Sequence, residues 1–183
     1  MAIDRTVNLE VLYICDIIKT MTNNVAEFNK ATKRILELAS QIDNDFLPII
    51  DVQYPLVDIV DVLRKKYQNS HFRDKYVGNM TFNGTVPYAK GFCALSTICI
   101  YNLYGGSEIW EPSAIKLGTW EHAPVVFLRD RMHNRAFDTT GDQFAPLIVP
   151  YDIGTPINKR IQDMKTPNKD MFIREIVGEL NRR

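Results

Sequence analysis

The sequence predicts an α+β fold in which helices surround a small antiparallel sheet. Apolar residues recur at steps of four and three over residues 14–42, which is the period of an amphipathic helix. A second run opens at Cys93 and is apolar nearly all round, which is typical of a central helix. The segments 113–117, 122–129 and 134–138 cluster or alternate β-branched and aromatic residues, which favours strands.

The composition is that of a globular protein. Of the 183 residues, 45% are hydrophobic and 24% are charged. Basic and acidic residues both number 22, so the net charge of zero indicates no general attraction to nucleic acid or anionic lipid. No apolar run approaches the ~20 residues that span a bilayer. Asp4 and Arg5 stand where a signal peptide needs its apolar stretch. We therefore expect a cytoplasmic protein with neither nucleic acid nor membrane as a partner.

The N-terminal stripe predicts a long helix over roughly residues 6–42. Its positions are Ile14, Ile18, Met21, Val25, Phe28, Thr32, Ile35, Ala39 and Ile42, of which only Thr32 is polar. Such a stripe suits self-association or a partner helix, or packing of the helix along its own domain, which is the favoured interpretation. Pro55 suits the start of a second helix, Leu56 to Tyr67. We expect residues 1–70 to form a helical region and residues 71–183 a catalytic core, within one compact domain.

The rest of the chain completes the predicted topology. Residues 68–90 are polar and rich in turn formers, which predicts a loop, with a short strand at Met80 to Phe82. The helix that opens at Cys93 ends at Gly105-Gly106, which suits a left-handed stop. Polar residues 130–133 predict a hairpin turn, and the segments 156–164 and 168–181 predict two closing helices.

Cys93 is the candidate nucleophile. The chain has three cysteines without C-x-x-C spacing, so neither a disulfide framework nor a zinc site is expected, and no metal or cofactor is predicted. Cys93 begins a helix, where unpaired N–H groups and the helix dipole favour a thiolate and lower the thiol pKa. Cys99 lies about 240° further round the helix and is expected in the core, as is Cys15.

A nucleophilic cysteine needs a base, and the chain has three histidines. His71 falls in the predicted loop and His133 in the predicted turn, where solvent is expected to surround it. His122 begins an apolar strand, which would hold its ring in place as general base catalysis requires.

The predicted hairpin supplies a third candidate residue, a carboxylate that could orient the histidine ring. If it turns near residue 130, positions whose numbers add to about 260 face each other, which pairs His122 with Asp138. Asp138 also closes an apolar strand, a costly position for a carboxylate without a partner. Asp142, four residues later, is the alternative, but Asp138 is preferred.

The order of these motifs resembles a known superfamily. Gly91-Phe92-Cys93 opening a helix, His122 opening a strand, and Asp138-Thr139-Thr140 closing the next are similar to the Cys…His…Asp-x-Thr order of papain-like and transglutaminase-like enzymes. The segment 138–144 resembles that of bacterial deamidase toxins and effectors of this fold. The resemblance covers roughly residues 80–150, and it implies a triad of Cys93, His122 and Asp138. It departs from the family because no Trp follows Cys93, the interval to His122 is short, and no upstream glutamine is evident.

Oxyanion or substrate contacts are therefore expected from other residues. The candidates are Asn83, Tyr88, Trp120 and Gln143, with Asn79 as a further choice for the oxyanion. The resemblance implies a cysteine hydrolase that acts on a protein or peptide amide through a thioester, with deamidation, proteolysis and transglutamination left open. It also implies by analogy an effector delivered into, or expressed in, a host cytosol.

Two other functions follow from different features. A non-enzymatic scaffold or inhibitor could use the striped helix 14–42 to bind a partner, with the triad residues only structural. A nucleotide- or metal-dependent enzyme is disfavoured, because the chain has no G-x-x-x-x-G-K-[ST] or G-x-G-x-x-G motif and Gly105-Gly106 follows a helix.

Overall fold

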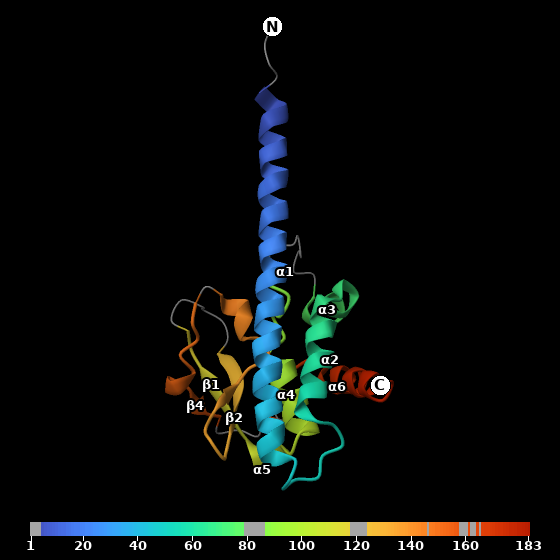
Figure 1. The fold of residues 1–183 in the computed structure, drawn as a ribbon, viewed down its shortest axis with the longest axis vertical. Helices are drawn as coiled ribbons and strands as arrows, with labels where there is room; N and C mark the ends of the chain where they lie inside the picture. Colours follow the sequence, from blue (N-terminus) through green and yellow to red (C-terminus); the bar gives the residue numbers. More distant parts are fainter. Residues whose placement is uncertain are drawn as a thin grey trace.

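A computed structural model describes residues 5–78, 87–117, 124–145, 147–157, 161, 164 and 166–183, with side chains from Asn24 onward. It confirms an α+β architecture with a long N-terminal helix and a small antiparallel sheet. The helices are α1 (Arg5–Phe46), α2 (Leu56–Gln68), α3 (Ser70–Val77), α4 (Cys93–Leu103), α5 (Gly106–Ile109) and α6 (Lys169–Leu180). Figure 1 shows that the other elements gather around the C-terminal half of α1.

The sheet has the order β3-β2-β1-β4. Its strands are β1 (Trp110–Ile115), β2 (Val125–Asp130), β3 (Ala136–Phe137) and β4 (Thr155–Pro156). Every residue of β2 is buried, because both faces of this central strand are covered. Leu128 belongs to the main core with the helices, whereas Val125 and Phe127 pack into a smaller cluster with Phe144. This strand therefore runs between two apolar layers.

The expected hairpin register is wrong by five residues. Leu128 pairs with Phe137 and Arg129 with Ala136, so facing positions add to 265. The cause is Asp130, whose carboxylate accepts the main-chain N–H of His133 (2.7 Å) and of Arg135 (3.0 Å). These bonds close the turn over residues 131–134, within one residue of the predicted 130–133, but about a higher midpoint than the pairing of His122 with Asp138 requires. An odd shift also exchanges the two faces of a strand. The pairing of His122 with Asp138 therefore cannot be derived from this hairpin.

From Phe28 onward, α1 packs along its own domain, as the favoured interpretation of the stripe expected. Phe28, Ala39 and Ile42 are buried in the main core. The connection to α2 is fixed by Asp43, whose two carboxylate oxygens accept the N–H groups of Leu56 (2.8 Å) and Val57 (2.9 Å). These are first-turn N–H groups of α2 that lack partners within the helix.

The helix that begins at Cys93 is central, as expected. Its buried residues include Leu95, Ile98 and Cys99, which confirms Cys99 as a core residue. Gly105 follows with φ of +71°, a left-handed conformation that glycine adopts at little cost. The predicted stop at Gly105-Gly106 is therefore confirmed.

Two elements of the structure differ from those predicted from the sequence. The segment read as a loop from residue 68 contains α3, which Asn69 begins by accepting the N–H of Phe72 at 2.9 Å. The local sequence hid this helix because its mean hydropathy is low and its apolar face is short. The helix expected over 156–164 begins instead as β4, and Ile157 donates its N–H to Pro112 of β1. The strand expected at residues 80–82 lies outside the described residues. The expected helix at 168–181 is confirmed as α6.

None of the helices in the described part of the chain combines the length and the apolarity needed to cross a lipid bilayer.

Candidate functional site

Cys93 is the first residue of α4 and its side chain is only partly exposed. Burial raises the pKa of its thiol, and the charge of Asp138 raises it further. Main-chain hydrogen bonds with Val126, Ala94 and Cys93 itself act in the opposite direction and are outweighed. The expectation that the helix start lowers this pKa is therefore wrong, because desolvation exceeds the effect of the N–H groups. A thiol of this kind needs a base to accept its proton during attack.

Hydrogen bonds at Val126 hold the start of α4 against the sheet. The Thr97 hydroxyl, one turn after Cys93, donates to the main-chain oxygen of Val126 at 3.1 Å. Cys93 interacts with the main chain of the same residue. The central strand therefore fixes the position of the sulfur.

Asp138 follows β3 directly, as the sequence indicated. Its Oδ1 accepts the main-chain N–H and the hydroxyl of Thr140, both at 2.7 Å, and its Oδ2 accepts the Tyr151 hydroxyl at 2.8 Å. Burial raises the pKa of Asp138, while these donors lower it. The effect of Asp138 on the Cys93 thiol shows that the two groups lie near each other, although 44 residues separate them in the chain.

Tyr151 joins the same cluster, and no local pattern in the sequence pointed to it. Burial and the charge of Asp138 raise the pKa of its hydroxyl, and Cys93 contributes in the same direction. Gly141 leaves room for this hydroxyl, because a Cβ at that position would lie 2.5 Å from the Tyr151 oxygen. Cys93, Asp138 and Tyr151 therefore form one partly buried electrostatic cluster.

Gln143 lies beside the start of α4, in the short helix η1 (Gly141–Phe144). Its Oε1 accepts the N–H of Gly91 at 3.2 Å, and Gly91 is held in a left-handed conformation (φ +86°). The side chain is buried, with 9% exposed, and its Nε2 has no hydrogen-bond partner in the part of the chain that the structure describes. Because Gly91 fixes which end of the amide is oxygen, the buried donor must face away from Gly91.

The loop that carries Asp138 and Gln143 is held by Arg64 of α2, which sequence reasoning missed. Arg64 is 1% exposed and donates to Thr32 Oγ1, the main-chain oxygens of Phe28 and Thr139, and both carboxylate oxygens of Asp142. All five of its donors are used. The available signal was Thr32, the one polar member of the apolar stripe, which accepts from Arg64 at 2.9 Å.

Tyr67 supports the loop from a second direction. Its hydroxyl is hydrogen-bonded to Ser96 of α4 and lies 3.2 Å from Thr139 Oγ1. Burial raises the pKa of this hydroxyl. The side chain thus joins α2, α4 and the segment after β3.

The other sequence candidates are distributed as follows. His122, Trp120, Asn79 and Asn83 lie outside the described residues. His71 is an exposed residue of α3, and His133 is exposed in the hairpin turn, as expected, within 3.7 Å of Asp130. Both oxygens of Asp142 bind Arg64, whereas those of Asp138 accept from Thr140 and Tyr151.

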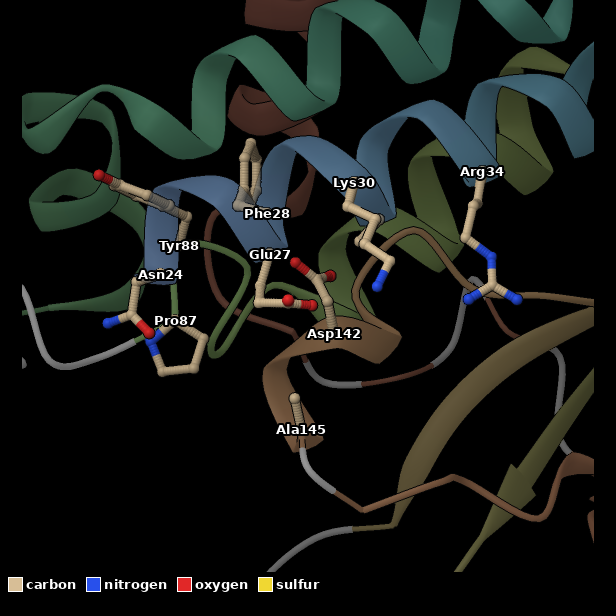
Figure 2. Close-up of a pocket in the computed structure, with 10 residues that line it drawn as sticks. Asn24, Glu27, Phe28, Lys30, Arg34, Pro87, Tyr88, Asp142 and Ala145 are labelled. Atoms are coloured by element: carbon tan, nitrogen blue, oxygen red, sulfur yellow. The ribbon is translucent and has the colours of Figure 1, made fainter. Parts of the chain in front are cut away.

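A groove between α1 and η1 leads away from Asp138. It comprises two hollows of about 200 and 280 Å³ that share Ala31, Arg34, Asp142 and Ala145. The larger hollow also reaches Asp138 and Gly141, and the smaller one reaches Lys30 and Tyr88. Figure 2 shows the smaller hollow, with side chains of α1 extending toward the η1 segment. We call this surface the α1–η1 groove.

The described residues contain no group of three or more His, Cys, Asp or Glu side chains arranged to hold a metal ion. Comparison of the chain with protein-family models, with curated proteins and with solved structures gives no match.

Proposed function

We propose that this chain is a thiol hydrolase of papain-like or transglutaminase-like fold that acts on a protein or peptide amide. The observation that carries the proposal is the proximity of Cys93, at the start of a central helix, to the partly buried carboxylate of Asp138. A helix that packs on an antiparallel strand at its cysteine end supports the same fold. His122 is the proposed base.

The reaction proceeds through a thioester. The Cys93 sulfur attacks the amide carbonyl carbon while His122 accepts the thiol proton, so that a tetrahedral oxyanion forms. The oxyanion collapses, the carbon–nitrogen bond breaks, and His122 returns the proton to the departing ammonia or amine. Water then attacks the thioester, releases the carboxylic acid and restores the thiol. Asp138 stabilises the protonated ring of His122.

The raised pKa of Cys93 fits a base-assisted attack. A thiol that stays protonated at neutral pH reacts only when a neighbouring base removes its proton. Reaction at the sulfur is thereby limited to substrates that the site positions beside the base.

Gln143 supplies the donor for the oxyanion in this proposal. Its Nε2 is buried beside the start of α4 and has no partner among the described residues, which is costly unless a ligand accepts its hydrogen bond. A pre-oriented donor of this kind contributes about 3 kcal/mol to stabilisation of the transition state in acyl transfer. Gln143 thereby replaces the upstream glutamine of the papain family.

The test is labelling with a substrate-like alkylating probe, such as a peptide vinyl sulfone, which forms a thioether with an activated cysteine, followed by mapping of the modified cysteine. We expect Cys93→Ala and His122→Ala to abolish labelling and Cys99→Ala, a buried control, to retain it. Equal labelling of wild type and Cys93→Ala contradicts the proposal. Mass spectrometry of incubated proteins then separates Gln-to-Glu conversion, cleavage and cross-linking.

A second function is favoured by the shape of α1. Figure 1 shows its N-terminal half extending beyond the other elements, and the sequence there continues the apolar stripe through Ile14 and Ile18. A helix of this kind suits a scaffold or inhibitor that binds another helix. Truncation of residues 1–22 separates the two functions, since the hydrolase predicts retained Cys93 labelling and the scaffold predicts loss of activity in cells that Cys93→Ala leaves intact.

A further inference from the structure

We propose that the α1–η1 groove binds an extended, acidic segment of the protein substrate and so determines which amide reaches Cys93. This inference rests on the proposed function, because the groove is assigned to the same site. It specifies the chemical class of the substrate, which the triad residues alone leave open.

The groove is continuous with the proposed catalytic cluster. Its larger hollow is lined by Asp138 and Gly141, and it shares Arg34 and Ala145 with the smaller one. At its far end lie Pro87 and Tyr88, only a few residues before Cys93 in the chain. A chain segment that lies in this groove is therefore bordered by α1 on one side and by the loops of the site on the other.

The charges in the groove favour an anionic ligand. Lys30 and Arg34 line it, and neither has an ion pair within the described ranges. Asp142 also lines it, but Arg64 binds both oxygens of that carboxylate (2.7 and 3.0 Å) and neutralises its charge. Glu27 is the one remaining acid of the smaller hollow. Two cations against one anion give the smaller hollow a net positive charge, whereas Asp138 adds an acid at the end of the larger hollow nearest Cys93.

The spacing of the two cations matches an extended peptide. Lys30 and Arg34 lie four positions apart on α1, which places their Cβ atoms about 6 Å apart on one face of the helix. Alternate residues of an extended strand project to the same side at intervals of about 6.6 Å. Carboxylates at positions i and i+2 of the substrate therefore suit the two cations. Figure 2 shows both side chains extending from α1 on the side of Asp142.

The groove suits a peptide better than a nucleic acid. A short peptide can place its two carboxylates at Lys30 and Arg34 alone, whereas a phosphate backbone carries one charge per nucleotide and would also bring negative charge against Glu27. The exposed apolar side chain of Leu147 lines the larger hollow and offers a contact to a peptide side chain. A short acidic sequence with an apolar neighbour is thus the expected ligand.

The experiment measures binding without catalysis, by fluorescence anisotropy of labelled peptides on the full-length Cys93→Ala protein. The probes are an extended peptide with Glu-x-Glu and a matched peptide with Gln-x-Gln. We expect the acidic peptide to bind at least fivefold more tightly, and salt to weaken its binding. Lys30→Glu combined with Arg34→Glu should weaken acidic-peptide binding about tenfold, since each exposed ion pair contributes up to about fivefold.

Lys33→Glu is the matched control, because Lys33 lies on the same helix, is 81% exposed, pairs with Glu37 and does not line the groove. It should change acidic-peptide affinity less than twofold. Equal binding of the two peptides, or an equal effect of the groove and control variants, overturns the inference. Labelling of Cys93 is measured separately. If the probe labels other cysteines as readily as Cys93, the hydrolase proposal fails. The peptide-binding result by itself decides whether the groove binds an acidic segment.

Discussion

The main-chain N–H of Gly91 donates to Oε1 of Gln143 at 3.2 Å, so the short helix η1 after β3 is bonded to the segment that leads into Cys93. This bond orients the Gln143 amide and leaves its buried Nε2 as a donor without a partner among the described side chains. The oxygen of the Gln143 amide is thus bonded within the protein, whereas its nitrogen is available to a ligand.

The two ends of Gln143 can be separated by substitution. Gln143→Glu keeps an oxygen for Gly91 but removes the donor, so we expect the rate of acylation to fall about 10²–10³-fold. The measurement is the burst of p-nitrophenol from p-nitrophenyl acetate, together with the thermal unfolding midpoint. Gln143→Leu, which removes both ends, should reduce the rate similarly and also destabilise the fold by about 1–2 kcal/mol. An unchanged burst in Gln143→Glu rules out the donor role.

Asp138→Asn should change two reactions of Cys93 in opposite directions. The charge of Asp138 raises the pKa of the Cys93 thiol, so its removal lowers that pKa and increases the thiolate fraction at neutral pH. Alkylation by iodoacetamide between pH 7 and 9 should therefore become faster, with its pH midpoint shifted down. Acylation by p-nitrophenyl acetate should become slower, because His122 loses its orienting carboxylate.

The control for this prediction is Asp152→Asn, an exposed carboxylate next to Tyr151 in the chain. It should leave both rates within twofold of wild type. If Asp138→Asn slows alkylation as well, the charge of Asp138 does not act on the sulfur as described.

Gly141→Ala should displace the Tyr151 hydroxyl from Asp138. The added Cβ would lie 2.5 Å from that oxygen, whereas its next neighbours, Asp138 Oδ2 and Tyr151 Cζ, lie 3.6 and 3.7 Å away. We expect a loss of about 1–3 kcal/mol in the free energy of unfolding, measured with urea. Addition of Tyr151→Phe removes the clashing atom, so the double variant should be more stable than Gly141→Ala alone. Additive losses would show that the clash is not with the hydroxyl.

Arg64 should be essential for stability. Arg64→Leu leaves the partly buried carboxylate of Asp142 without its partner and frees acceptors on Thr32 and Thr139, so we expect a loss of about 3 kcal/mol in urea denaturation. Lys65→Ala, the next residue on the same helix, pairs only at the exposed surface with Asp61 and should cost less than about 0.5 kcal/mol. Arg64→Leu combined with Asp142→Leu should recover part of the loss, because both charges are then absent.

The sequence alone determined the elements whose apolar pattern is long. The stripe of α1, the apolar α4 with its stop at Gly105, and α6 follow from side-chain periodicity, which depends only on near neighbours in the chain. The position of Cys93 at the start of a central helix could be predicted for the same reason. The strand predicted at 134–138 is present as the two-residue β3, but the short helix α3 and the two-residue strand β4 could not be predicted, because so few residues carry too weak a periodic signal.

Tertiary structure alone decided the environment of the site. The hairpin register depends on how the Asp130 carboxylate binds the turn, which shifted it by five residues from the expected one. Arg64 and Tyr151 reach the loop around Asp138 from 74 residues before it and 13 residues after it, and no local pattern reports such contacts. The direction of the Cys93 pKa also depended on burial by distant segments, whereas the sequence indicated only the helix start. Periodicity specifies which residues turn inward, but desolvation and long-range hydrogen bonds depend on which segments meet there.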